Sequence, residues 1–329
     1  MRLNITGIKD SAGTLGPGPD GTFAHLGAQG GTEMMAKKIR EVVDPDLLAQ
    51  FHIIHSRVRD HMIDPNKVNL LVLHDTWDDP ENQHLEDARS LNRFAKLIFV
   101  SNFQQATFNM GRGVPYSRGI VMQNAIDPIE FTEADKKSDV VRLIYHTTPH
   151  RGLELLVPAY EELCKVHDNI HLDVYSSFAA YGWNDRDKPY EHLFDRLRNN
   201  PKATYHGFQP NPVVREALKR AHIFAYPCIW PETSCIAVIE VMSARCNVVT
   251  SNLHALPETC ANFATMYGYE EDPQLHANVF ANVLNMAVQE INNESIQSRL
   301  RFQKVFFDNY YGWELRKAQW NALLTSLLN

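Results

Sequence analysis

One stretch, residues 223–250, constrains the fold of this chain more than any other. It begins with an apolar run, Ile223–Tyr226, continues through a loop into a helical pattern over 234–244, and ends in a second predicted strand at 247–250. Two strands joined by a helix, rather than by a tight turn, are typical of parallel neighbours in a buried sheet. The stretch therefore predicts a strand–helix–strand unit and an α/β protein.

The same alternation recurs on both sides of this unit. Apolar runs that predict strands are separated by longer, amphipathic segments that predict helices. The predicted strands outside the central unit are 3–8, 51–55, 68–74, 96–101, 119–124, 141–145, 171–175 and 203–207. We therefore predict two doubly wound, Rossmann-like α/β domains that face a cleft. The charged stretch 132–139 is predicted to link them.

Length and charge narrow the class of protein. A chain of 329 residues is long enough to form two domains. A formal net charge of −7 argues against a general nucleic-acid binder, which would show a basic excess.

The cysteine pattern and the lengths of the apolar runs bear on where in the cell the protein is located. The five cysteines contain no Cys-x-x-Cys pair and are odd in number, so neither a zinc site nor a disulfide framework is indicated. No apolar run approaches the roughly 18–20 residues needed to span a bilayer, and the N-terminus lacks a signal-peptide pattern. A cytoplasmic protein is expected. The basic residues Lys37, Lys38 and Arg40 on one predicted helix would allow peripheral membrane contact, although such a face is usually only solvated.

Two carboxylates, Glu232 and Glu240, bracket the loop and the first turns of the central helix. Seven residues separate them, and a helix rises about 1.5 Å per residue, so one elongated ligand could touch both. The helix start between them offers free backbone N–H groups that suit a diphosphate. Taken alone, the two residues could equally be a solvated loop charge and a helix-surface charge.

The residues around these carboxylates carry a resemblance. The run Pro231-Glu-Thr-Ser-Cys-Ile-Ala-Val-Ile-Glu240, followed by Val248-Val-Thr-Ser and Leu256-Pro-Glu258, resembles the donor-binding signature of family 4 retaining glycosyltransferases, which have the GT-B fold. The resemblance implies that Glu240 holds the ribose of a nucleotide and that Glu232 contacts the donor sugar. It also implies that the backbone of Ser234, Cys235 and Ile236 faces the sugar and diphosphate.

Within and just after this run, the sequence departs from that family's pattern at three positions. Cys235 stands where many members have glycine, which leaves the backbone path around the phosphate open. Arg245 and Asn247 replace the usual glycine and proline after the helix, which affects the turn into the next strand.

Two segments of the first predicted domain extend the resemblance. His74 ends the strand 68–74, where ligands of open parallel sheets bind, and it resembles the family histidine that reaches the donor sugar. Gly30 and Gly31 open the helix predicted over 32–43, and they lie where family members place the acceptor and diphosphate side of the cleft. A histidine that caps a loop and a mobile glycine loop are the structural alternatives.

In the second domain, the loop from His146 to Gly152 precedes a predicted helix over 153–165. Family members carry an arginine and, five positions later, a lysine in this loop; here those positions hold His146 and Arg151. Arg151 is a candidate diphosphate clamp, because a guanidinium grips phosphate oxygens with two N–H groups. Phe208 lies where family members pack the nucleotide base, although it could equally belong to the core.

The C-terminal third is predicted to be helical over 274–290, 294–307 and 313–328. The step at Tyr310-Tyr-Gly-Trp313 resembles the family's entry into a last helix that packs back on the first domain. The predicted boundaries are therefore 1–131 for the acceptor-side domain, with 313–329 returning to it, and 132–312 for the domain that binds the nucleotide sugar.

The resemblance implies a retaining, metal-independent glycosyltransferase that uses a UDP- or GDP-sugar as donor and needs no cofactor. The predicted catalytic residues are His74, Arg151 and Glu232, and the acceptor would be a hydroxyl of a glycan, a lipid-linked saccharide or a protein glycan. Arg151 and the helix start near Ser234 would stabilise the charge of the leaving diphosphate.

Three alternatives are open at this stage. The two glutamates could be the acid and base of a glycoside hydrolase. Asp185-Arg-Asp187 or Asp44-Pro-Asp46 could hold a metal in an Asp-x-Asp transferase. The changes at His146, Cys235 and Arg245 would also suit a GT-B protein that binds a nucleotide sugar or a glycan without turnover.

Overall fold

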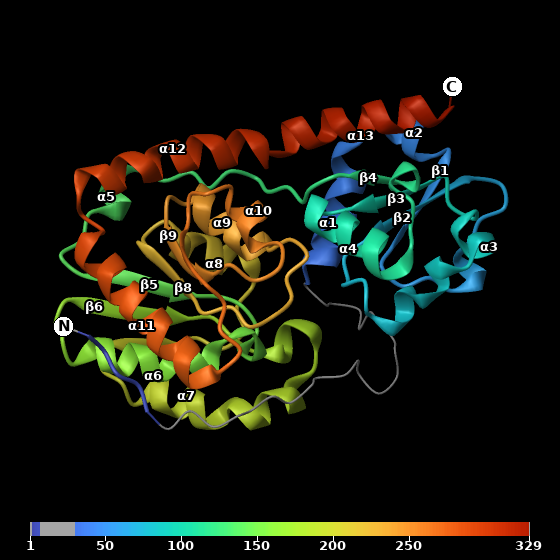
Figure 1. The fold of residues 1–329 in the computed structure, drawn as a ribbon. Helices are drawn as coiled ribbons and strands as arrows, with labels where there is room; N and C mark the ends of the chain where they lie inside the picture. The colour runs from blue at the N-terminus through green and yellow to red at the C-terminus, as the bar shows by residue number, and fades with distance from the viewer. Residues whose placement is uncertain (1, 7–29, 329) are drawn as a thin grey trace.

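The computed structural model describes residues 2–6 and 30–328, which form two parallel sheets flanked by helices (Figure 1). The first sheet has the order β1-β2-β3-β4, and its strands are Phe51–His55, Val68–Leu73, Lys96–Phe99 and Gly119–Val121. The second has the order β10-β9-β8-β5-β6-β7. Its strands β5 to β10 are Val141–Tyr145, Ile170–Val174, Ala203–Tyr205, Ile223–Tyr226, Asn247–Ser251 and Thr265–Tyr267. The prediction of two Rossmann-like α/β units is confirmed.

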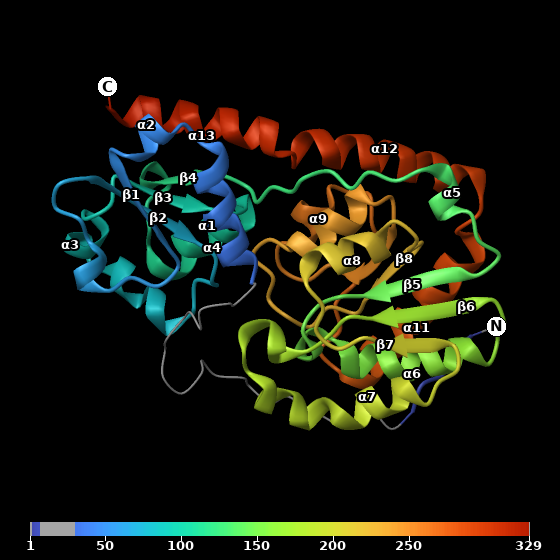
Figure 2. The same cartoon turned by 180° about the vertical axis from the view of Figure 1, so that it is seen from behind.

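Helices cover both faces of each sheet (Figures 1 and 2). The helices in the part of the chain that forms the first sheet are α1 Gly31–Val42, α2 Pro45–Leu48, α3 Ala88–Leu91 and α4 Asn102–Arg112. Those around the second are α5 Glu133–Lys136, α6 Leu153–Cys164, α7 Glu191–Arg198, α8 Asn211–Leu218, α9 Ile236–Ser243, α10 Leu256–Cys260, α11 Pro273–Glu290 and α12 Glu294–Tyr310. The last helix, α13, spans Trp313–Leu328.

The central strands are apolar because both of their faces are covered. All four residues of β8 and all five of β9 are buried, and the four of β8 with Val248 and Val249 of β9 belong to the large core of the second sheet. The first sheet lies between two smaller cores, one against α1 and α13 and the other against α4. Burial on both sides explains why β8 and residues 70–73 of β2 are continuous apolar runs in the sequence.

Within residues 30–328, the chain crosses between the sheets after β4 and again between α12 and α13. The first crossing, after β4, runs beside the second, because the Ile126 amide donates to the Tyr311 carbonyl at 2.8 Å. α12 lies along the second sheet, and α13 continues in nearly the same direction over the first (Figure 2). There Trp320 and Leu324 pack with Met35 in the core of the first sheet.

The N-terminal segment differs from the prediction of a first strand at 3–8. Residues 3–6 form no strand, and residues 7 and 8 lie outside the described residues. The Asn282 side-chain amide exchanges two hydrogen bonds with the backbone of Leu3, and Asn278 does the same with Ile5. These asparagines of α11 satisfy the extended backbone as a neighbouring strand would, so the segment lies on the second sheet's side of the molecule.

Arg245 adopts the left-handed conformation that the family pattern fills with glycine. Its φ is +59°, directly after α9, and a non-glycine residue there costs roughly 1–2 kcal/mol. The side chain compensates, since it forms a two-branched ion pair with Glu133 and lies 5.4 Å from the Phe131 ring centre. The departure from glycine therefore leaves the turn into β9 in its expected shape.

Polar contacts hold the two sheets' domains together next to the cleft. The Glu258 carboxylate accepts three hydrogen bonds of 2.8 Å from the start of α4, two from Asn102 and one from the Phe103 amide. The Thr233 hydroxyl donates to the His74 carbonyl at 2.7 Å, and the Ser101 hydroxyl donates to the Thr233 carbonyl at the same distance. A residue from the second domain thus helps to cap a helix of the first.

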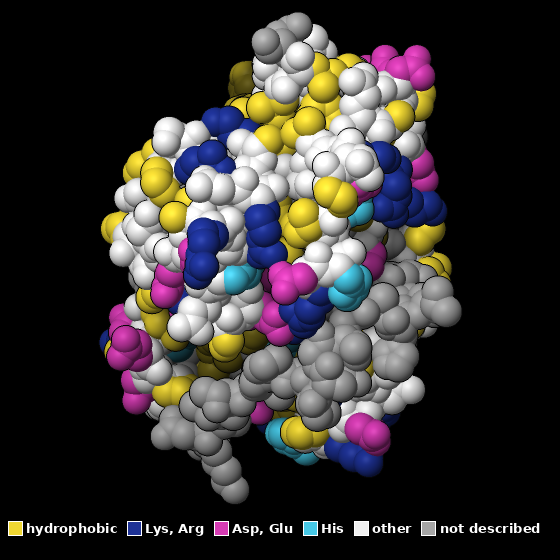
Figure 3. Space-filling model, turned by 90° about the vertical axis from the view of Figure 1, so that its right-hand side faces the viewer, with side chains coloured by type: hydrophobic (Ala, Val, Ile, Leu, Met, Phe, Trp, Pro, Cys, Tyr) yellow, Lys and Arg dark blue, Asp and Glu magenta, His cyan; other side chains and the backbone are white. Residues whose placement is uncertain are grey.

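No helix within the described residues is long and apolar enough to cross a bilayer. The basic residues of α1 are partly neutralised, because Lys38 lies 2.8 Å from Asp127 and Lys37 lies 3.8 Å from Glu41. On the face shown in Figure 3, Lys and Arg side chains are interspersed with Asp and Glu.

We predict that Glu258→Ala weakens the contact between the domains. The start of α4 loses its carboxylate partner, which should lower the free energy of unfolding by about 1–2 kcal/mol. Urea denaturation followed by circular dichroism measures this loss. Glu290→Ala, an exposed position at the end of α11, is the matched control. Equal transition midpoints for the two variants would contradict the prediction.

Candidate active site

A cavity of about 660 Å³ opens between the two sheets and is lined from both sides. Every residue that the sequence predicted for the donor site and the reaction lines it. From the first domain these are Gly30, Gly31 and His74, and from the second His146, Arg151, Phe208, Glu232, Ser234, Cys235, Ile236 and Glu240. The structure therefore brings together residues that are up to 210 positions apart, from Gly30 to Glu240.

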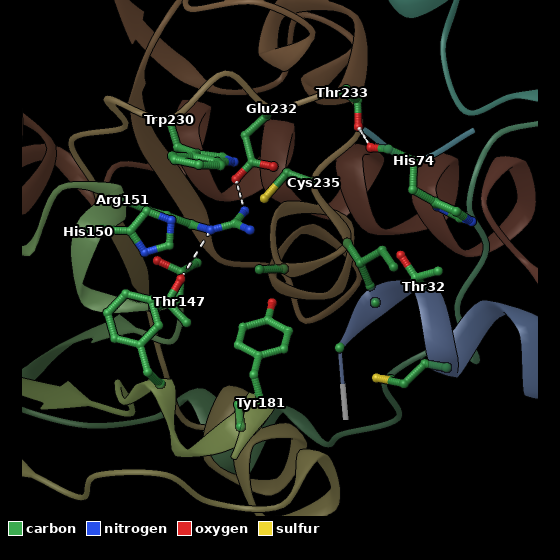
Figure 4. Close-up of a pocket in the computed structure, with 18 of the residues that line it drawn as sticks. Thr32, His74, Thr147, His150, Arg151, Tyr181, Trp230, Glu232, Thr233 and Cys235 are labelled. Carbon is green, nitrogen blue, oxygen red and sulfur yellow. Dashed lines mark hydrogen bonds and ion pairs between the residues drawn. The ribbon is translucent and has the colours of Figure 1, made fainter. Parts of the chain in front are cut away.

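Arg151 and Glu232 form a buried ion pair in one wall of the cavity (Figure 4). The Arg151 Nη1 lies 2.5 Å from Glu232 Oε1, which also accepts a 2.7 Å hydrogen bond from the Tyr226 hydroxyl. Burial by itself would lower the pKa of Arg151, but the Glu232 carboxylate raises it well above its usual range. The guanidinium therefore carries a permanent charge, which the adjoining carboxylate partly balances.

Glycine places the Arg151 loop against β8. Gly152 has a φ of +134°, and a Cβ there would lie 2.1 Å from the Pro227 carbonyl oxygen. The loop after β5 can therefore approach the loop after β8 closely, and the Ile229 amide donates to the Arg151 carbonyl. This approach brings Arg151 within reach of Glu232.

Two helix N-termini border the cavity without a side-chain cap. α9 begins after Cys235, whose φ of −96° and ψ of 100° are open to any residue, so glycine is not required there. On the opposite side, α1 begins after Gly30. A Cβ on Gly31 would lie 2.9 Å from the Ile236 side chain, so a glycine allows the starts of α1 and α9 to meet. Uncapped N–H groups on both sides suit an anion.

Glu240 is the fifth residue of α9, just over one turn from its start, and it is nearly inaccessible to solvent, with 4% exposure. Its Oε1 accepts a 2.6 Å hydrogen bond from Arg215 Nη1, and Asn211 Nδ2 donates to both carboxylate oxygens at 3.2–3.3 Å. Burial raises the pKa of Glu240, and the Arg215 charge opposes that rise.

The histidines of the cavity are neutral at pH 7. Burial lowers the pKa of His74 and of His150 to about 3 and that of His146 to about 4. His74 Nε2 lies 3.3 Å from His55 Nδ1, so the two rings share one hydrogen bond. His146 Nε2 is buried without a hydrogen-bond partner among the described residues. His146 therefore contributes a hydrogen-bonding group, but not the positive charge of the arginine that the family has at its position.

Several cavity residues were not predicted from the sequence. Trp230 and His150 meet edge to face with ring centres 4.5 Å apart, and Arg151 lies over the Trp230 ring. Both adjoin predicted site residues in sequence, so proximity to the motifs was an available signal. Arg57 and Asp79, 3.6 Å apart, line the first domain's wall with Asp75, and no family motif marked Arg57 or Asp79.

The two Asp-x-Asp pairs have structural roles. Asp187 accepts hydrogen bonds from the Ser177 hydroxyl and the Phe178 amide, and Asp185 pairs with Lys188. Asp44 caps α2. None of these aspartates lines the cavity described above. No group of three or more His, Cys, Asp or Glu side chains suited to a metal ion occurs within the described part of the chain.

Comparison with known proteins decides the family. The description "Glycosyl transferases group 1" matches residues 128–296, slightly more than half of the chain and most of the second domain. The chain belongs to this family. The cavity, with its buried Glu240 and uncapped α9, lies within the matched region except for the first domain's wall.

Relatives and solved structures agree with this family. One subunit of the human phosphatidylinositol N-acetylglucosaminyltransferase is 26% identical over 145 residues, which cover 42% of this chain and 28% of that protein. A glycosyltransferase from Rickettsia africae has a similar structure, with a TM-score of 0.68, 15% identity, and coverage of 91% of this chain and 81% of that one. Anabaena HepE in complex with UDP-glucose gives a TM-score of 0.63 at 15% identity, covering 79% of this chain and 72% of that one. At these identities the solved structures establish the fold.

We predict that the folded protein loses stability as the pH falls from about 6.5 toward 3. The unfolded chain protonates His74 and His146 near pH 6.5, whereas the folded chain keeps them neutral down to about 3 and 4. Each histidine should contribute a slope of up to about 1.4 kcal/mol per pH unit.

Urea unfolding at several pH values measures this slope. His146→Gln should make it shallower, whereas His61→Gln should keep the wild-type slope, because His61 is exposed in the folded protein. Identical slopes for all three proteins would show that burial of His146 does not oppose its protonation.

Proposed function

We propose that this protein is a retaining glycosyltransferase that moves a sugar from a nucleotide-diphosphate sugar to a hydroxyl acceptor. One observation carries the proposal: Arg151 and two uncapped helix N-termini line the same cavity as the buried carboxylate Glu240. Positive groups of this kind suit a diphosphate, and a carboxylate accepts hydrogen bonds from vicinal hydroxyls such as those of ribose.

The proposed donor extends along α9. Its ribose would bond Glu240, its diphosphate would meet the backbone of Ser234, Cys235 and Ile236, and its base would lie near Phe208. The unpartnered Nε2 of His146 offers a hydrogen-bonding group to the diphosphate. UDP is the favoured nucleotide, because structures of the same fold hold UDP-glucose or UDP.

In the proposed reaction, the bond between the sugar's anomeric carbon and the diphosphate oxygen breaks, and a bond to the acceptor oxygen forms on the same face. The acceptor proton passes to the departing phosphate oxygen. Arg151 and the N–H groups of α9 would stabilise the negative charge that grows on the diphosphate, without a metal. Glu232 Oε2 and His74 would orient the sugar, since Glu232 Oε1 is already held by Arg151 and Tyr226.

The acceptor side would be the wall formed by the first domain. Its described lining residues include four carboxylates and a single arginine or lysine, namely Glu33, Asp75, Asp78 and Asp79 with Arg57. Carboxylates bind sugar hydroxyls well, so a glycan or a lipid-linked saccharide is the proposed acceptor. The human relative's name includes phosphatidylinositol, and a cytoplasmic enzyme with a lipid acceptor would contact the membrane peripherally.

A second candidate is a protein that binds a nucleotide sugar or a glycan without transferring the sugar. The neutral His146, in place of the family's arginine, favours it, because the site then has one cation fewer for the leaving diphosphate. The transferase and a protein that binds a nucleotide sugar would both bind the nucleotide, but only the transferase would release it in the presence of an acceptor.

The first experiment is a thermal-shift screen of UDP, GDP, ADP and their sugars, followed by an assay for nucleotide release with simple glycoside acceptors. Selective stabilisation by one nucleotide is expected, because a ligand that binds the native state raises its apparent stability. Binding and acceptor-dependent release together support the transferase, whereas binding without release supports the second candidate. No stabilisation by any nucleotide would contradict the transferase and a nucleotide-sugar binder alike, and would leave only the glycan-binding form of the second candidate. Repeating the screen with EDTA tests metal independence.

Arg151→Ala should lower kcat/KM for the donor by roughly 10²–10³-fold, because the leaving diphosphate loses its nearest cation. Arg220→Ala, at an exposed position after α8, is the control and should keep wild-type kinetics. Kinetics of the two variants against one donor measure the effect. Unchanged kcat/KM in folded Arg151→Ala would remove Arg151 from the reaction.

A further inference from the structure

Arg215, a residue of α8 that no motif marked, connects the proposed ribose site to the chain between the domains. Its Nη1 donates to Glu240 Oε1 at 2.6 Å. Its Nη2 donates to the backbone carbonyls of Asp127 at 2.7 Å and Pro128 at 3.2 Å. One rigid guanidinium thus bonds a carboxylate inside the cavity and two carbonyls of the first crossing between the sheets.

The same network reaches the first domain. The Asp127 carboxylate lies 2.8 Å from Lys38 Nζ on α1, the helix whose N-terminus borders the cavity. A continuous series of polar contacts therefore runs from α1 through Asp127 and Arg215 to Glu240. The two bonds from Arg215 to the Asp127 and Pro128 carbonyls depend on the crossing holding its present position relative to α8.

The bonding of Glu240 leaves room for a ligand. A carboxylate has about four lone-pair sites. Arg215 and Asn211 use Oε1, whereas Oε2 receives only the 3.2 Å contact from Asn211 among the described residues. Because Glu240 also lines the cavity, Oε2 is the oxygen available to the hydroxyls of a bound ribose.

We propose that Arg215 is a positioning residue for the donor: it orients Glu240 toward the ribose and ties that orientation to the first crossing between the domains. The inference rests on the proposed function, since it assumes a nucleotide in the cavity. Donor binding and the arrangement of the two domains are then coupled through one side chain.

The charge of Arg215 should make nucleotide binding depend on pH in a characteristic way. Glu240 is buried, which raises its pKa, and Arg215 is the cation that faces it. Asn211 is neutral, and Asp127 adds negative charge that raises the pKa further. Without the guanidinium, Glu240 should take up a proton at a higher pH and lose the ability to accept two hydroxyl hydrogen bonds. Nucleotide binding should then weaken most on the acid side.

The test uses two variants. Arg215→Met removes the charge and keeps much of the side chain's volume. Arg215→Lys keeps the charge but replaces the planar guanidinium by a single ammonium nitrogen. UDP affinity is measured by calorimetry from pH 5.5 to 8.5. Arg215→Met should bind UDP at least tenfold more weakly at pH 6.5, with part of the loss recovered at pH 8.5. Arg215→Lys should lie between Arg215→Met and the wild type. The donor KM should rise more than kcat falls.

Two controls separate positioning from a general loss of structure. Arg220→Met, which follows α8, should keep wild-type affinity at every pH. In a Glu240→Gln background, Arg215→Met should cause little further loss of UDP affinity, because it acts through the carboxylate.

Folded variants with an unchanged UDP affinity and pH profile would overturn the proposal, as would equal losses of affinity with and without the Glu240 carboxylate. If Arg215→Met does not fold, the result for Arg215→Lys decides. A wild-type protein that binds no nucleotide would instead overturn the proposed function on which the inference rests.

Discussion

The ion pair between Arg151 and Glu232 is the interaction on which the cavity depends. It joins the loop after β5 to the loop after β8. The Tyr226 hydroxyl also bonds Glu232, and Gly152 allows the two loops to approach each other closely. Removing one partner would leave an unpaired charge in a buried setting, which is strongly unfavourable. The loop from Trp230 to Cys235 therefore has a defined path, and that path sets where α9 begins and where its free N–H groups point.

The parallel topology explains why the remaining groups meet at the same place. The loops that follow β2, β5 and β8 all emerge at the carboxyl ends of their strands, so His74, Arg151 and Glu232 face the space between the sheets. Contacts from Glu258 and Thr233 hold the domains at this edge, while Arg215 connects the other end of the cavity to the crossing chain. The two ends are thus stabilised by different elements.

Much of the fold could be predicted from local pattern. The strands at 51–55, 141–145 and 223–226 and the helix at 313–328 have the predicted bounds, because buried strands and long amphipathic helices have clear periodicities. The predicted strand at 3–8 is different, since residues 3–6 bond asparagine side chains of α11, and nothing nearby in sequence indicates those partners. The short strand β10 and the helix α10 were also missed, because three to five residues carry too little periodicity.

The sequence by itself determined the α/β class, the alternation of strands and helices, and the residue types that the cavity would contain, because these depend on periodicity and on short motifs. Only the tertiary structure decided which charges remain available. It paired Arg151 with Glu232, left His146 neutral, and placed Arg215 between Glu240 and the crossing chain. Burial and partner distance set the charge and orientation of a side chain, and both depend on segments that are distant in sequence.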